Sequence, residues 1–157
     1  MLEILLKDDN WFPAAAVISL IASAVVIIRA RRRRAAAWTT ATAACNLFFG
    51  LMIGILGIGH LFAVTTKTLL GILPPHIHLW FAIPFGFALT VPAWWLTIEA
   101  GHLLTRKASA IRNAMWLNAS LAIVLASAGP SVALAVLAGV NMLLLLLSRR
   151  SKLPAAV

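Results

Sequence analysis

The chain has 157 residues, of which 62% are hydrophobic and only 11% are charged, and its formal net charge is +9. This composition excludes an ordinary soluble globule and indicates an all-α integral membrane protein with one domain, residues 1–157. Basic residues between long apolar runs are what the positive-inside rule produces, so the charge does not indicate nucleic-acid binding. The single cysteine, Cys45, excludes an internal disulfide and a CxxC motif.

The first apolar run covers residues 11–28 and ends at a dense arginine cluster. Its 18 residues make about 27 Å of helix, enough to cross the hydrocarbon core of a bilayer. Because the charge follows this run and does not precede it, we expect a retained signal anchor. The arginines cannot lie in lipid and are predicted to meet anionic headgroups at one membrane face: Arg29, Arg31, Arg32, Arg33 and Arg34.

The second predicted span, residues 41–64, carries small side chains along one face. A stripe of small residues lets another helix approach closely, so this face is expected to pack against protein. Asn46 and His60 lie beside the stripe and are expected to face protein or a cavity. The stripe consists of Ala43, Gly50, Gly54, Gly57 and Leu61.

Residues 65–77 contain threonines, a glycine and a proline pair, and are predicted to be a connection. The third predicted span, residues 78–98, contains Pro84 and Pro92, so we expect a kinked helix. One side of this helix is predicted to face inward because residues seven positions apart return to it: His78, Phe85, Pro92 and Glu99.

After a short basic connection, the last apolar stretch is interrupted only by Gly129 and Pro130. It is too long for one span, so we expect two short helices, residues 113–128 and 131–148, joined by a tight turn. Asn118 and Asn141 lie equally far from this turn, which predicts a hydrogen bond between their amides. A re-entrant hairpin, giving four spans in total, is the alternative.

The distribution of basic residues predicts the orientation of the five spans. Eleven of the thirteen lysines and arginines fall on one side, which puts the amino terminus outside and the carboxyl terminus in the cytoplasm of a bacterial inner membrane. The tryptophans are expected to form aromatic belts, since each lies near a predicted span end: Trp11, Trp38, Trp80, Trp94, Trp95 and Trp116.

Three histidines, His60, His76 and His78, converge near the outer ends of the second and third spans. Imidazole binds copper, zinc and iron, so the three form a candidate metal site. His60 and His78 come from neighbouring helices at equal depth, as the ligands of a bis-histidine haem do, and a pigment is a related candidate. Two other interpretations stay open: hydrogen bonds to loop carbonyls and lipid headgroups, and contact with a proton or a quinone head.

Glu99 and His102 lie one helical turn apart at the inner end of the third span. This spacing matches half of a di-iron Glu-x-x-His motif, but the sequence has no second one, which excludes a di-iron centre within one subunit. We expect Glu99 to pair with Arg106 or another arginine of the inner face. Proton uptake at the membrane edge is the alternative.

No serine or cysteine lies beside a plausible base, so an enzyme is not favoured. The small extramembrane mass and the glycine and proline faces favour an accessory subunit of a larger, energy-converting membrane complex, in contact with other integral subunits and lipids. Its layout is similar in outline to the membrane-anchor subunits of respiratory oxidoreductases. The alternatives are a haem- or metal-binding redox subunit that uses the outer histidines, and a small oligomeric transporter.

Overall fold

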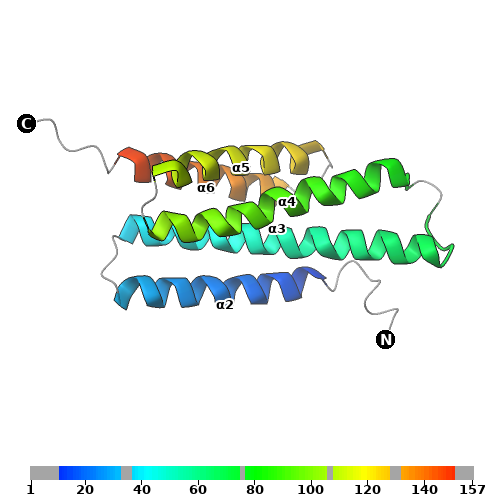
Figure 1. Cartoon of the computed structure of the whole chain (residues 1–157), viewed down its shortest axis with the longest axis horizontal. Coiled ribbons are helices and arrows are strands. Elements are labelled where there is room, and N and C mark those ends of the chain that lie inside the picture. Colours follow the sequence, from blue (N-terminus) through cyan, green and yellow to red (C-terminus); the bar gives the residue numbers. More distant parts are fainter. Residues whose placement is uncertain (1–10, 33–36, 75–76, 106–107, 128–131, 151–157) are drawn as a thin grey trace, which may run out of the picture.

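The computed structural model describes residues 11–32, 37–74, 77–105, 108–127 and 132–150. These residues form five helices that lie side by side with their long axes roughly parallel (Figure 1). The predicted all-α membrane fold is confirmed, since α2, α3 and α4 are each long and apolar enough to cross a bilayer. The helices are α2 (Trp11–Arg32), α3 (Ala37–Leu69), α4 (Leu79–Leu104), α5 (Ala108–Ser127) and α6 (Val132–Arg150).

The last two helices are shorter than the first three. With 20 and 19 residues, α5 and α6 are about 30 and 28 Å long, close to the thickness of a hydrocarbon core. Among the residues whose side chains are described, α2, α3 and α4 are the candidate membrane spans, and α6 contributes a shorter apolar stretch, Val136–Leu147. The helices pack against each other and against the rest of the bundle. That both cross the membrane stays a prediction, and the predicted tight turn lies outside the described residues.

Helix α2 is longer than its apolar run. It continues into the basic cluster, where Arg29, Arg31 and Arg32 form its last turn. Cations are favourable there because the carboxyl end of a helix carries partial negative charge. Arg33 and Arg34 lie outside the described residues.

The first part of the predicted connection after the second span is wrong, because α3 remains helical to Leu69. The Thr68 hydroxyl donates to the Val64 carbonyl at 2.7 Å, so this polar segment is compatible with helix. The helix ends at Gly71, whose φ of 67° is left-handed. There the Gly71 N–H donates to the Thr68 carbonyl and the Ile72 N–H to the Lys67 carbonyl, the two bonds of a Schellman cap.

The glycine stripe of α3 packs against protein, as predicted, and that protein is the chain's own α4. A Cβ atom on Gly50 would lie 2.7 Å from the Thr97 hydroxyl oxygen, and one on Gly57 would collide with Thr90. Trp94 lies over Gly54. The stripe therefore closes the interface between α3 and α4, and Trp94 contributes to that interface.

Helix α2 is held to α3 at two points. The Ser23 hydroxyl donates to the Ala44 carbonyl at 3.1 Å. Farther along, the Trp11 indole lies on Gly59, where an added Cβ would be 2.6 Å from a ring carbon. Gly59 lies outside the predicted stripe, and only the position of Trp11 explains why a glycine stands there.

The face of α4 that looks inward differs from the predicted one. Both internal prolines lie within one continuous helix. Glu99 is buried, as predicted, but Phe85 and Pro92 are only half-buried and His78 is exposed. The buried positions follow alternating steps of four and three, which is the spacing of close helix packing: Ala82, Gly86, Leu89, Ala93, Leu96, Ala100 and Leu103.

The helices end at similar levels at one end of the bundle and at different levels at the other (Figure 1). At the latter end, the α3–α4 hairpin extends beyond the other three helices (right side of Figure 1). Trp11 in the first turn of α2 packs on Gly59, and α3 continues ten residues farther to Leu69, about 15 Å of helix. We call residues 69–74 and 77–81 the hairpin end.

Candidate functional site

Three asparagines from three helices meet in the centre of the bundle. The Asn118 amide nitrogen of α5 donates to the Asn46 side-chain oxygen of α3 at 2.7 Å. The Asn141 amide nitrogen of α6 donates to the Asn118 side-chain oxygen at 3.4 Å. All three side chains are fully buried. The predicted bond between Asn118 and Asn141 is thus confirmed, and Asn46 joins it as a third member.

These asparagines lie at matching positions along their helices. Asn46 is nine residues from the start of α3 and Asn141 nine residues from the end of α6, each about 14 Å of helix. Asn46 and Asn118 also donate to the carbonyls of Thr42 and Ala114, four residues back in their own helices. Amide bonds between helices stabilise a bundle where no water competes, so the cluster joins α3, α5 and α6.

A second polar cluster surrounds the carboxylate of Glu99, which is 4% exposed. One carboxylate oxygen accepts hydrogen bonds from the Asn113 amide at 2.9 Å and the Trp95 indole at 3.2 Å. The other lies 3.2 Å from Nδ1 of His102. An ionised carboxylate only accepts, so Nδ1 carries the proton in this arrangement. Three donors thus replace the water that the buried carboxylate has lost.

The described partners of Glu99 differ from the predicted arginine. His102, one turn away and partly exposed, is the side chain that pairs with the carboxylate. Arg106 lies outside the described residues. Sequence reasoning missed Trp95 and Asn113. The four-residue spacing from Trp95 to Glu99 is a usable signal, whereas Asn113 approaches from another helix and leaves none.

His60 lies between α3 and α4 with its ring edge against Phe85. Its Nε2 atom is 3.1 Å from the Ala82 carbonyl oxygen. Because that oxygen can only accept, Nε2 carries a proton, and Nδ1 is the ring nitrogen left for a metal. This contact is a hydrogen bond to a main-chain carbonyl, one of the interpretations left open by the sequence.

His78 begins α4 and is exposed, with its ring stacked on Trp80 at a centroid distance of 6.3 Å. His76 lies outside the described residues. His60 and His78 are therefore near the same end of the α3–α4 hairpin, but their rings pack on different neighbours. Within the described part of the chain, no three or more histidine, cysteine, aspartate or glutamate side chains are grouped as a metal site.

The arrangement can hold helices together and keep a buried carboxylate hydrogen-bonded. It brings Asn46, Asn118 and Asn141 into one cluster and Glu99 and His102 into another. Asn113 and Asn118 are five residues apart on α5, about 8 Å, so the two clusters lie at neighbouring depths. Comparison with protein-family models, with curated proteins and with solved structures finds no match to this chain.

Proposed function

We propose that the chain is a non-catalytic integral subunit of a larger membrane protein complex, and that it docks to its partner through the hairpin end. The observation that carries this proposal is the reach of that apolar end past α2.

The length of helix α2 indicates where the two membrane surfaces lie along the bundle. Its 22 residues are about 33 Å long, and its basic last turn marks one surface. The other surface then lies near Trp11 and its contact Gly59. Leu69 is about 15 Å farther along α3, whereas a headgroup layer is only about 5–8 Å thick. On this geometry the hairpin end stands outside the lipid.

The hairpin end is nevertheless apolar. Leu69 is 81% exposed and Trp80 is 77% exposed. Clustered apolar side chains of this size in water indicate a surface that another protein covers. The remaining exposed members are Leu70, Ile72, Leu79 and Phe81.

The interior supports a structural role. The asparagine cluster and the glycine stripe join the chain's own helices to one another. The stripe therefore does not need a second subunit, which removes one reason for expecting a partner and leaves the hairpin end as the main one. We place the chain in a bacterial cytoplasmic membrane, in an energy-converting complex, with the partner's docking site on the outer side.

The proposal is tested by purifying the tagged chain in mild detergent and analysing it by native gel, mass spectrometry and absorption spectroscopy. We expect co-migration with a larger complex and no stoichiometric cofactor on this chain. The double variant Leu69→Ser with Trp80→Ser should release it from the complex. The matched control is Ile123→Ser, because Ile123 is 70% exposed on α5, away from the hairpin end.

Two results would replace the proposal. A small lone particle with a haem spectrum or bound metal, lost in His60→Ala, favours the redox subunit. A homo-oligomer of this chain alone favours the transporter.

A further inference from the structure

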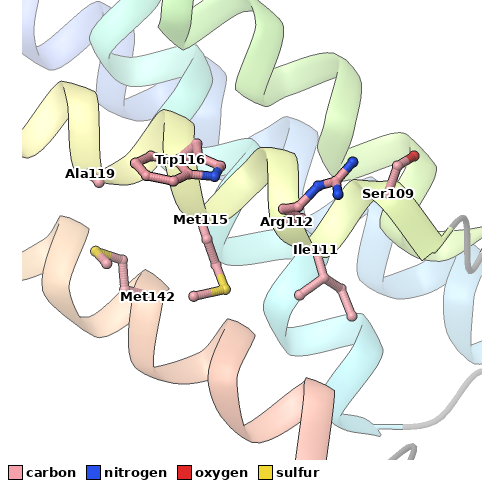
Figure 2. A pocket seen from close by; sticks show the side chains of 7 residues that line it. All are labelled: Ser109, Ile111, Arg112, Met115, Trp116, Ala119 and Met142. Atoms are coloured by element: carbon pink, nitrogen blue, oxygen red, sulfur yellow. The ribbon is translucent and has the colours of Figure 1, made fainter.

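A groove runs between α5 and α6 with a volume of about 660 Å³, within the usual range for small-molecule pockets. One end of its lining is polar and the other is apolar (Figure 2). The lining residues are Ser109, Ile111, Arg112, Met115, Trp116, Ala119 and Met142.

Arg112 supplies the charge at the polar end of the groove. It is exposed in the second turn of α5, with Ser109 three residues before it. Glu99 is the single carboxylate side chain among the described residues, and Asn113, Trp95 and His102 already surround it. Within the described chain, Arg112 has no carboxylate left to pair with. An anion from outside the described chain therefore fits this end.

The position of Arg112 suits a lipid headgroup. It precedes Asn118 by six residues, which places it about 9 Å from the central asparagine cluster, toward the end of the bundle where the arginines of α2 lie. Trp116, one turn farther along α5, is 72% exposed. Long arginine side chains near helix ends reach toward the membrane surface, so the guanidinium of Arg112 meets a headgroup phosphate from this depth.

The apolar end of the groove leads deeper into the membrane. Met115 of α5 and Met142 of α6 point into the space between their helices (Figure 2). Methionine side chains are flexible and adapt to a chain of variable shape. Ala119 leaves the wall open because its side chain is a single methyl group. A free phosphate ion would use Arg112 and leave this part of the groove empty.

We propose that this groove binds one anionic phospholipid, with its phosphate at Arg112 and Ser109 and an acyl chain along Met115, Ala119 and Met142. The guanidinium selects the headgroup charge, and the methionine-lined part requires the chain. Basic pockets between membrane helices on the cytoplasmic side hold acidic lipids by this combination. The inference is independent of the docking role of the hairpin end.

The test is native mass spectrometry of the purified full-length chain after exchange into detergent with phosphatidylglycerol or phosphatidylcholine of identical acyl chains. We expect one phosphatidylglycerol retained per chain and little phosphatidylcholine. Arg112→Gln should reduce phosphatidylglycerol retention about fivefold, the factor associated with one interfacial charge. Ala119→Trp should reduce it by blocking the groove. The control Arg31→Gln removes an exposed charge from α2 and should retain the lipid.

The competing occupants give different results. Displacement of phosphatidylglycerol by inorganic phosphate, or equal retention of short-chain and long-chain phosphatidylglycerol, would show a simple anion site and overturn the proposal. So would equal losses in Arg112→Gln and Arg31→Gln, or a dimer of this chain that excludes lipid. Circular dichroism checks folding, and if Ala119→Trp does not fold, the chain-length comparison on the unmodified protein still tests the groove.

Discussion

Asn118 and Asn46 are 72 residues apart in the sequence, and a hydrogen bond of 2.7 Å joins their side chains in the centre of the bundle. Asn118 is the middle member of its cluster, since it donates to Asn46 and accepts from Asn141. The cluster is unevenly bonded, because the Asn141 side-chain oxygen has no hydrogen-bond partner among the described residues.

This unevenness predicts a difference between two substitutions. Asn118→Ala should lower the free energy of unfolding by about 1–2 kcal/mol, because it removes two bonds between helices and takes the partner from the Asn46 side-chain oxygen and from the Asn141 amide nitrogen. Asn141→Leu should cost less, because it removes one long bond together with an unpaired oxygen. Unfolding in mixed micelles with increasing denaturing detergent measures both. Equal losses would contradict a central role for Asn118.

The α3–α4 interface predicts opposite effects for two glycines. Gly57→Ala should destabilise the bundle by about 1–3 kcal/mol, because the new methyl group collides with Thr90, whose main-chain atoms also lie close. Gly101→Ala should be neutral or stabilise by up to about 1 kcal/mol, because nothing lies within 4 Å of its added Cβ and alanine favours helix. Thermal unfolding followed by circular dichroism separates the two. A neutral Gly57→Ala would show that α3 and α4 do not pack this closely.

The donors around Glu99 predict an order of effects on stability. Asn113→Ala should cost about 1–3 kcal/mol, because it takes a hydrogen bond from a buried carboxylate. His102→Ala should cost less, because its side chain is 35% exposed and water can replace it. Melting temperatures of the two variants in one detergent test the order. The reverse order would mean that His102 is the main partner of Glu99.

His60 and His78, which lie near the same end of the α3–α4 hairpin, should differ in chemical reactivity. His78 is exposed, whereas Nε2 of His60 is held by the Ala82 carbonyl. Diethyl pyrocarbonate, which modifies accessible imidazole nitrogens, should therefore label His78 faster than His60. Peptide mass spectrometry measures both rates, and His78→Gln identifies the faster signal. Equal rates would indicate that the hydrogen bond at His60 is open in solution.

Long apolar runs, together with the break at Gly129 and Pro130, were sufficient to predict the five helices of the described residues and their order. The helix ends were harder to predict, since Thr65–Thr68 look like a connection by polarity and yet continue α3 until Gly71 caps it. Hydrophobicity marks where lipid ends, whereas the backbone stays helical until a residue changes its conformation.

Contacts between helices were likewise only partly predictable from the sequence. The pairing of Asn118 with Asn141 was predictable because the two residues lie equally far in sequence from the same predicted turn. The entry of Asn46 depends on how α3 rotates and packs, and no local pattern contains that information. The prediction of the inward face of α4 was wrong because it used only residues spaced seven positions apart. The buried residues of α4 instead follow one another at alternating spacings of four and three residues.

The asparagine cluster also bears on how the chain is assembled during synthesis. Asn46 is made and inserted long before Asn118, and Asn141 comes later still, in the last helix. Until α6 packs on the bundle, the Asn118 side-chain oxygen lacks the donor that Asn141 provides. A ribosome product that ends before α6 thus lacks the donor for this oxygen in the interior of the bundle.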